Sequence, residues 1–350
     1  MFATPSPVPT GLHLRTAPKV LLHEHLDGGL RPETLFDLCR ARAVEIPARD
    51  AASLAQWMHA NADSGSLVRY LRGFAITCAA MATPEACERI AFEAAEDARE
   101  DGCVLAEFRM APLLLEEYGM SGEAVMEALL AGLARSSLAC GLIVCGMRPE
   151  PPERTLHAAR LAARYRDGGV IGFDLAGAEL GFSAAVHAEA FAVARDAGLG
   201  LTCHAGEAGG GENVMEAADL GVSRIGHGIH VVRGDTPQQA AQWVARARDA
   251  GLHFEVCPSS NVHTGAVRSL ESHPIRDMIE AGLSVSCSTD NRLMSGVTLT
   301  AELEALHART GLTRAQLASL MRAAVGASFM PRAERDAATA KVESGWAPLS

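Results

Sequence analysis

Short, nearly continuous apolar runs recur along the chain, and each is rich in Val, Ile, Leu or Cys. Strands that are buried on both faces of a parallel sheet have this character, because helices cover both sides of such a sheet. The pattern therefore predicts eight strands. They comprise residues 20–25, 104–110, 142–147, 170–176, 199–205, 224–230, 253–258 and 283–288.

Stretches with helical periodicity fill most of the gaps between these runs. Residues 84–100 follow Thr83, a residue of the N-cap type, and begin with Pro84, which suits a first helical position. Further helices are predicted within residues 122–137, 154–167, 184–198, 213–221, 237–251 and 273–282. Strict alternation of strands and helices predicts an α/β fold, a (β/α)₈ TIM barrel. A doubly wound open sheet is the alternative, but no Gly-x-Gly-x-x-Gly motif follows a strand.

The gap between the first two predicted strands is much longer than the others. We expect extra helices there, around residues 32–42 and 67–81, on the side of the barrel where active sites form. In the second piece, a spacing of i, i+3, i+4 and i+7 places four apolar residues on one helix face. These are Leu67, Tyr70, Leu71 and Phe74. The face is either ordinary core packing or a wall that covers a substrate.

The chain shows no linker or internal repeat that would divide it. Helices within residues 312–329 and 334–346 are expected to close the fold. We therefore expect one domain over residues 1–350, in which Pro-rich residues 1–17 form a loose N-terminal arm. The arm lacks the apolar segment of a signal peptide, and no run approaches the ~20 apolar residues of a membrane span.

Composition narrows the class of protein. The 350 residues are 48% hydrophobic and 21% charged, with a formal net charge of -11, which argues against a nucleic-acid partner and suits an enzyme that acts on a small molecule. The nine cysteines form no Cys-x-x-Cys pair, and several lie in apolar runs. Buried, reduced thiols in a cytoplasmic protein are the expected state. The sequence does not indicate an oligomeric state.

Candidate metal ligands stand at the ends of three predicted strands. His23 and His25 are two residues apart in the first strand, so both side chains point to the same face. His204 ends the fifth predicted strand, and Asp290 follows the eighth. Three imidazoles and one carboxylate suit a zinc ion, with water at an open position. Barrel enzymes place their sites at these carboxyl ends of the strands.

Two further residues lie where they could carry a reaction. Zinc lowers the pKa of a bound water towards ~7, so hydroxide becomes available at neutral pH. Glu207 follows His204 by three residues and is placed to give a proton to a substrate, provided that it is protonated when the substrate binds. His227, in the sixth predicted strand, is placed to orient or deprotonate the water.

Seven segments match a known family in their order along the chain. They are PKVLLHEHLDGGLRPETL, AEFRMAP, VIGFDLAGAE, CHAGEAGG, RIGHGIH, FEVCPSSN and STDN, and the resemblance runs from about Pro18 to about Leu299. On these segments the chain resembles the adenosine deaminases, zinc enzymes of the amidohydrolase barrel superfamily. The resemblance implies hydrolytic deamination of adenosine, and of 2′-deoxyadenosine, to inosine or deoxyinosine and ammonia.

The resemblance also implies roles for individual residues. One zinc ion would be bound by His23, His25, His204 and Asp290. Glu207 would protonate the purine N1, and His227 would assist the attack on C6. Asp27 would hold the ribose 5′-hydroxyl, and the backbone of Gly177 would contact N3. The apolar helix face would be the substrate lid.

The residue after Asp290 is one departure from the family pattern. Many members have a second Asp where this chain has Asn291, and that residue contacts N7, an acceptor. An amide donates there without titrating, whereas a carboxylate must first be protonated.

Two other functions stay open. One is deamination of another aminopurine nucleoside such as aminodeoxyfutalosine, or of adenine, and the other is non-catalytic binding of a nucleoside. Related deaminases of adenine and of aminodeoxyfutalosine tend to carry Glu where this chain has Asp27. A non-catalytic binding protein would be expected to lose Glu207 or one of the metal ligands.

Overall fold

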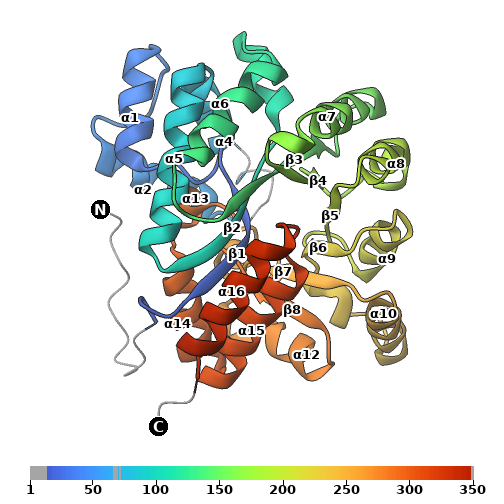
Figure 1. Ribbon diagram of the computed structural model, residues 1–350. Coiled ribbons are helices and arrows are strands. Elements are labelled where there is room, and N and C mark those ends of the chain that lie inside the picture. The colour runs from blue at the N-terminus through green and yellow to red at the C-terminus, as the bar shows by residue number, and fades with distance from the viewer. Residues whose placement is uncertain (1–13, 66–69, 71, 348–350) are drawn as a thin grey trace.

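In the computed structural model, which describes residues 14–65, 70 and 72–347, eight parallel strands lie side by side in chain order. They are β1 (Lys19–His25), β2 (Cys103–Met110), β3 (Cys140–Met147), β4 (Val170–Ala176), β5 (Gly200–Ala205), β6 (Arg224–His227), β7 (His253–Val256) and β8 (Ser284–Cys287). The last strand returns to the first, because the backbone N–H of Asp290 donates to His23 at 2.9 Å. The predicted TIM barrel is therefore confirmed (Figure 1).

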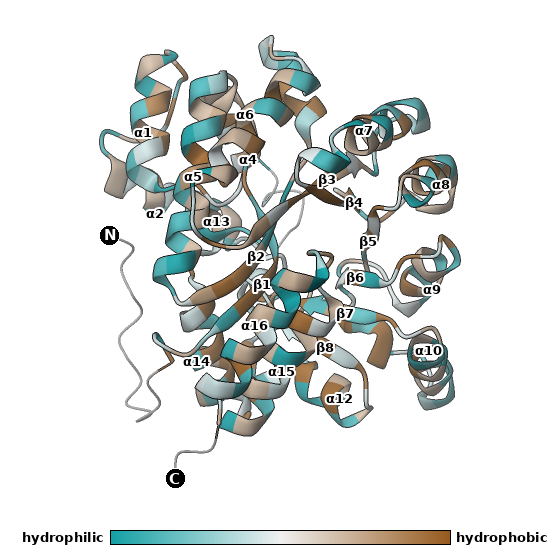
Figure 2. Ribbon diagram, in the orientation of Figure 1, coloured by the Kyte–Doolittle hydropathy of each residue, from teal (hydrophilic) through white to brown (hydrophobic). Residues whose placement is uncertain are grey.

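A ring of helices covers the barrel (Figure 1). It comprises α5 (Pro84–Glu100), α6 (Gly122–Ala134), α7 (Pro152–Arg164), α8 (Ala188–Asp196), α9 (Gly211–Asp219), α10 (Pro237–Asp249), α12 (Ile275–Glu280) and α15 (Arg314–Ala327). In Figure 2 brown runs are plain in β3, whereas β1, β6 and β7 also carry teal residues, and the surrounding helices alternate brown with teal. The strands are buried on both faces, and the helices bury one face against them. Thr83 caps α5 as predicted, since its hydroxyl accepts from the N–H of Ala86 at 3.2 Å.

Extra helices follow β1, as the long gap predicts. They are α1 (Pro32–Ala41), α2 (Ala51–Ala62) and α4 (Gly73–Met81). These helices lie together at one side of the barrel (Figure 1). The sequence pattern did not predict α2, whose buried residues Leu54, Met58 and Ala62 form only a narrow stripe at i, i+4 and i+8. Leu67 and Leu71 of the predicted apolar face lie outside the described residues.

The sixth strand is shorter than predicted. β6 ends at His227, and residues Ile229–Val232 form a 3-10 turn instead of continuing the strand. Gly228 has φ 65° and His227 has φ 62°, so the backbone leaves the sheet at this point. Apolar character alone does not distinguish such a buried turn from a strand.

The remaining helices lie after β7 or complete the C-terminal part of the chain. They are α11 (Pro258–His263), α13 (Arg292–Ser295), α14 (Leu299–Thr310) and α16 (Arg332–Gly345). None of the helices in the described part of the chain combines the length and the apolar character that a membrane span requires. All nine cysteines are unpaired, and all but Cys140 are buried.

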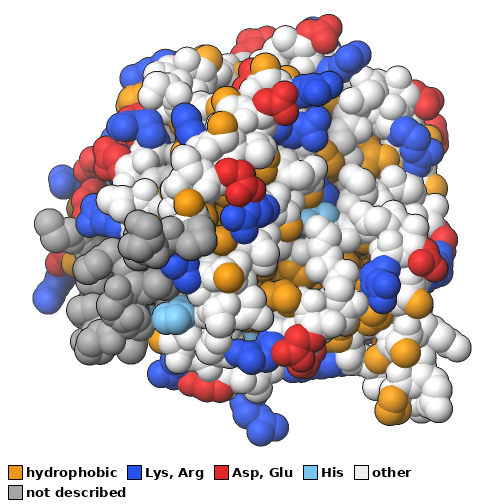
Figure 3. All heavy atoms as spheres, turned by 60° about the horizontal axis from the view of Figure 1, so that its bottom comes forward, with side chains coloured by type: hydrophobic (Ala, Val, Ile, Leu, Met, Phe, Trp, Pro, Cys, Tyr) orange, Lys and Arg blue, Asp and Glu red, His pale blue; other side chains and the backbone are white. Residues whose placement is uncertain are grey.

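The described end of the predicted arm, residues 14–17, packs against the barrel. Leu14 is fully buried, and the ammonium group of Lys19 donates to the carbonyl oxygens of Leu14 and Ala17 at 2.8 and 2.9 Å. Residues 1–13 of the arm lie outside the described residues. On the face shown in Figure 3, basic and acidic side chains are interspersed and form no patch of one sign.

Candidate active site

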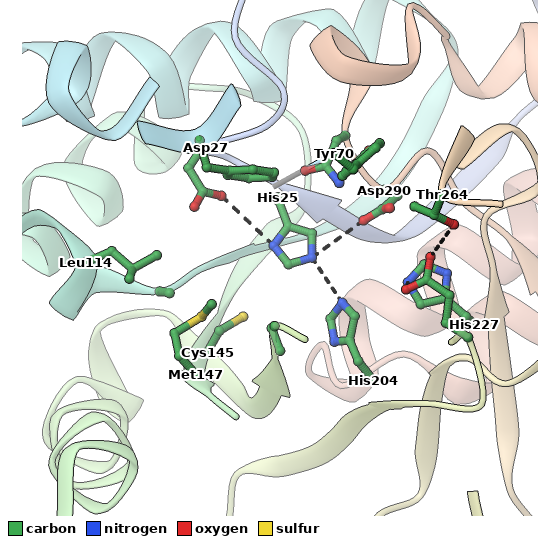
Figure 4. Close-up of a pocket in the computed structure, with 16 residues that line it drawn as sticks. His25, Asp27, Tyr70, Leu114, Cys145, Met147, His204, His227, Thr264 and Asp290 are labelled. Atoms are coloured by element: carbon green, nitrogen blue, oxygen red, sulfur yellow. Dashed lines mark hydrogen bonds and ion pairs between the residues drawn. The ribbon is translucent and has the colours of Figure 1, made fainter. Parts of the chain in front are cut away.

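A cavity of about 250 Å³ opens where the strands end. Its walls are formed by His25, Asp27, Tyr70, Phe74, Ala111, Leu114, Cys145, Met147, Ala176, Gly177, His204, Glu207, His227, Thr264, Asp290 and Asn291. These include all the predicted site residues that the structure describes, except the fully buried His23 (Figure 4). Residues that are far apart in the sequence thus meet at one mouth of the barrel.

Imidazoles and one carboxylate converge at the floor of this cavity. His23, His204, His227 and Asp290 each place a possible ligand atom within 4.8 Å of the others. The Nε2 atom of His25 lies 3.2 Å from Nε2 of His204 and 3.6 Å from Oδ1 of Asp290 (Figure 4). Three of the predicted ligands therefore lie in this group together with His227, and the fourth, His25, contacts it through His204 and Asp290.

Two of these residues hold a backbone conformation that L-residues rarely adopt. His227 and Asp290 both have φ 62°. For a non-Gly residue this region costs on the order of 1–3 kcal/mol, and it persists where the surrounding structure imposes it. Asp290 is held by backbone bonds to β1 and by the hydroxyl of Ser260, which donates to its Oδ2 at 2.5 Å. The fold thus keeps its carboxylate turned into the cluster.

Buried carboxylates fix two of the imidazoles. Glu255 accepts from Nδ1 of His23 at 2.9 Å, and Asp174 accepts from Nδ1 of His204 at 3.1 Å. Each ring therefore presents an unprotonated Nε2 to the cluster. The Nε2 atom of His23 is buried and has no hydrogen-bond partner. Metal-binding histidines are commonly held by a carboxylate in this way.

The distances between candidate ligand atoms fit one metal ion. Metal–nitrogen bonds of about 2.0–2.1 Å in tetrahedral geometry imply ligand atoms roughly 3.3 Å apart. The Nε2 atoms of His25 and His204 are 3.2 Å apart, and Nε2 of His23 lies 3.3 Å from Oδ1 of Asp290. A cation would also satisfy the partnerless nitrogen of His23. The residues present therefore fit a bound metal ion.

Arg109 on β2 joins the two supporting carboxylates. Its guanidinium group donates to Asp174 at 2.9 Å and to Glu255 at 2.6 Å, and all three side chains are fully buried. Burial alone would raise the pKa of Asp174, but His204 and Arg109 beside it hold that pKa well below its usual range. Both carboxylates can thus accept hydrogen bonds from the imidazoles at neutral pH.

A chain of hydrogen bonds sets the tautomer of His227. The backbone N–H of Ile275 donates to Nδ1 of His273, so Nε2 of His273 donates to the amide oxygen of Asn261 at 3.2 Å. The amide nitrogen of Asn261 then donates to Nδ1 of His227 at 3.1 Å. Burial lowers the pKa of His227 to about 4, so the neutral ring carries its proton on Nε2. This nitrogen faces the cluster as a donor, which distinguishes His227 from His23 and His204.

Glu207 lies in a setting that raises its proton affinity. Burial, with a smaller effect of Asp290, raises its pKa to about 7. The hydroxyl of Thr264 donates to its Oε1 at 3.0 Å, and Nε2 of His227 lies 3.7 Å from its Oε2. Glu179, from the loop after β4, accepts the backbone N–H groups of residues 206–209 at 2.6–3.1 Å. The loop that carries Glu207 is therefore fixed in place.

Other polar groups that line the cavity lack partners. Asp27 and Asn291 are each 3% exposed, and Oδ1 of each lacks a hydrogen-bond partner. Burial raises the pKa of Asp27 to about 7. Gly177 has φ 94°, a conformation that favours glycine. Tyr70 and Phe74 line the cavity with their ring centroids 6.4 Å apart.

Sequence reasoning missed the residues that position the cluster. It assigned no role to Asp174, Glu179, Glu255, Asn261 or Thr264, although all except Thr264 lie in the segments that carried the resemblance. Acidic residues inside the predicted apolar strands, such as Asp174 and Glu255, were a signal that could have found two of them. A buried carboxylate needs a partner, and the imidazoles at the neighbouring strand ends provide one.

The sequence model of the family described as adenosine deaminase matches residues 18–344. An adenosine deaminase of Mycobacterium avium is 41% identical over 342 residues, which cover 92% of this chain and 93% of the relative. The chain belongs to the adenosine deaminase family. Membership confirms the resemblance on which the expected chemistry rests.

Solved structures related to this family share the whole fold. The adenine deaminase of Arthrobacter aurescens is 26% identical with a TM-score of 0.86, and covers 94% of this chain and 98% of its own. The ADAL protein of Arabidopsis, crystallised with IMP, is 25% identical with a TM-score of 0.83, and covers 95% of this chain and 98% of its own. The solved structures similar to this chain thus include an adenine deaminase and a protein crystallised with IMP.

Proposed function

We propose that the chain catalyses the zinc-dependent hydrolytic deamination of adenosine and 2′-deoxyadenosine to inosine and deoxyinosine. The observation that carries the proposal is the placement of Glu207 beside the imidazole and carboxylate cluster in one buried cavity. Relatives that carry the name adenosine deaminase, at 41% identity over nearly the whole chain, support the same reaction. In this reaction water adds to C6 of the purine and ammonia leaves from the same carbon.

The metal ligands would be His23, His25, His204 and Asp290. Imidazole nitrogens with one carboxylate oxygen form a donor set that suits zinc better than magnesium or calcium. When bound, zinc supplies water activation at neutral pH. Asp174 and Glu255 keep Nε2 of their imidazoles unprotonated, so the ligand atoms are ready without loss of a proton.

Glu207 would donate a proton to N1 of the purine. Protonation there withdraws electrons from C6 and makes that carbon a better electrophile for water. His227 would orient the attacking water through its Nε2–H, because its Nδ1 is occupied by Asn261. The buried position of both residues excludes bulk water from the reacting atoms.

Substrate recognition would come from other residues that line the cavity. Asp27 would bind the ribose 5′-hydroxyl, the N–H of Gly177 would bind N3, and the amide of Asn291 would donate to N7. Tyr70 and Phe74 would cover the ring, while the same role for Leu67 and Leu71 falls outside the described residues. An apolar lining with a few polar groups that converge is usual for a site that holds a planar heterocycle.

A substrate panel on metal-analysed protein tests the proposal. We expect the absorbance spectrum of adenosine or 2′-deoxyadenosine to be replaced by that of inosine or deoxyinosine, with release of one ammonia per molecule. Adenine and 5′-substituted adenosines should react far more slowly. Strong activity on 5′-substituted adenosine would contradict the role of Asp27. No turnover of any aminopurine by metal-loaded protein would contradict the reaction itself and favour a binding protein.

A further inference from the structure

A second group of metal-ligating side chains lies outside the cluster at the barrel mouth. His59, Asp63 and His263 each place one possible ligand atom within 4.8 Å of the other two. His59 and Asp63 stand four residues apart at the end of α2, so their side chains share a face. His263 is the last residue of α11. Two elements that are far apart in the sequence thus contribute to one group.

The hydrogen bonds of this trio leave ring nitrogens available. Nδ1 of His59 lies 3.3 Å from the carbonyl oxygen of Met294, which can only accept, so Nε2 of His59 keeps its lone pair. Nδ1 of His263 is buried and has no partner. Within the described part of the chain, no hydrogen bond or ion pair joins the three side chains to one another. Helix-end residues that merely stabilised each other would be expected to do so.

The backbone holds the two contributing elements together. The N–H of Gly65, just after α2, donates to the carbonyl oxygen of His263 at 2.9 Å. The rings of His59 and His263 meet edge to face with centroids 5.1 Å apart. Little reorganisation would therefore be needed to bind an ion.

We propose that His59, Asp63 and His263 bind a second divalent transition-metal ion of the zinc class, separate from the metal of the barrel mouth. Two imidazoles and a carboxylate with water at the fourth position match an open zinc site, whereas magnesium and calcium prefer all-oxygen ligands. Asp63 is exposed, which gives an ion access from solvent. Binding ties α2 of the inserted helices to the end of α11.

The position of this second site bears on the mouth cluster. The residue after His263 is Thr264, whose hydroxyl donates to Glu207 at 3.0 Å. An ion held by His263 therefore stiffens the end of α11 from which Thr264 contacts Glu207. With three ligands and an exposed carboxylate, the second site binds zinc more weakly than the mouth cluster.

Zinc stoichiometry tests the proposal. Protein that carries one tightly bound zinc is dialysed against micromolar zinc, and metal content and thermal midpoint are measured. We expect a second equivalent and a higher midpoint, with no such change in millimolar magnesium. His59→Ala and Asp63→Ala should each lose the second equivalent and keep the first. His157→Ala, which removes an exposed histidine of α7, is the matched control and should keep both.

Two results would overturn the second site. One is a wild-type protein that stops at one equivalent of zinc. The other is a second equivalent that persists in both His59→Ala and Asp63→Ala. Because Asp63 is exposed, its replacement leaves the core intact, so loss of the second ion in that variant cannot be attributed to unfolding. The first equivalent in each variant reports directly that the barrel mouth is unchanged.

Discussion

His23, His204 and His227 differ in what holds the ring nitrogen that faces away from the cavity. Carboxylates accept from the first two rings, whereas the amide of Asn261 donates to the third. A carboxylate partner leaves Nε2 free to bind a metal, and an amide donor leaves a proton on Nε2. On the proposed function, residues that touch no substrate thus decide which histidine would bind metal and which would orient water.

Asn261→Asp tests this assignment, because it keeps the size of the side chain and the bond from His273. An aspartate would accept from Nδ1 of His227 and so move the ring proton away from Nε2. We expect kcat to fall by roughly 10–100-fold, with little change in KM or in metal content. Steady-state kinetics on metal-analysed protein give the answer. Undiminished or higher kcat would show instead that His227 acts as the base.

Glu207→Gln tests the proton donor. The amide has nearly the same shape but no acidic proton, so we expect kcat to fall by roughly 10²–10⁴-fold. Zinc content and thermal midpoint should stay close to wild type, since Thr264 can still donate to the amide oxygen. Near-normal turnover in this variant would require another proton donor.

At the scale of elements, Glu302 links α14 to the start of α11. Its Oε1 accepts the backbone N–H of Ser259 at 3.1 Å, and burial raises its pKa to about 8. The folded-state pKa lies above the ordinary value, so the protein loses stability as pH rises from about 4.5 through about 8. The loss amounts to roughly 1.4 kcal/mol for each pH unit in that window.

Glu302→Gln should remove this pH dependence, because the amide keeps the acceptor and does not titrate. We expect the variant to gain thermal stability over wild type progressively between pH 5 and pH 8. Thermal melts of both proteins across this range provide the measurement. A difference in melting midpoint that does not change with pH would contradict the raised pKa.

Close packing of α5 on α6 depends on a glycine. A Cβ atom at Gly132 would lie 2.3 Å from the carbonyl oxygen of Glu88, so Gly132→Ala should destabilise the protein by roughly 1–3 kcal/mol. Gly326, in α15, has nothing within 4 Å of such an atom. Gly326→Ala should therefore be neutral or stabilise by up to ~1 kcal/mol. Urea denaturation distinguishes the two, and equal effects would contradict the packing argument.

The sequence pattern predicted those elements whose burial leaves a simple signature. The eight strands are short and largely buried, with enough apolar residues to mark them, and α5 carries both a cap and a wide apolar face. The helix α2 was not predicted because its buried stripe is narrow. The predicted strand over residues 224–230 was wrong beyond His227, because a buried turn is as apolar as a strand. The pattern of apolar residues indicates which residues are buried, but it distinguishes a strand from a buried turn only weakly.

At the scale of the whole molecule, barrel closure brings the site together. Candidate ligands could be named from sequence because a barrel gathers the ends of its strands at one mouth. The residues that support these ligands could not be named. The hydrogen bonds that Asp174 and Glu255 accept from the imidazoles depend on strand register and on Arg109, which joins the two carboxylates across the barrel. We propose that the barrel and its inserted helices form one domain.

Zinc-dependent turnover of adenosine is the measurement that tests the central claim most directly. Protein stripped of metal by a chelator is titrated with zinc while deamination of adenosine is followed. We predict that activity is absent without metal, rises in proportion to the first equivalent of zinc and reaches its plateau there. Full activity of the stripped protein, or no deamination of adenosine by protein that holds one zinc, would contradict the account.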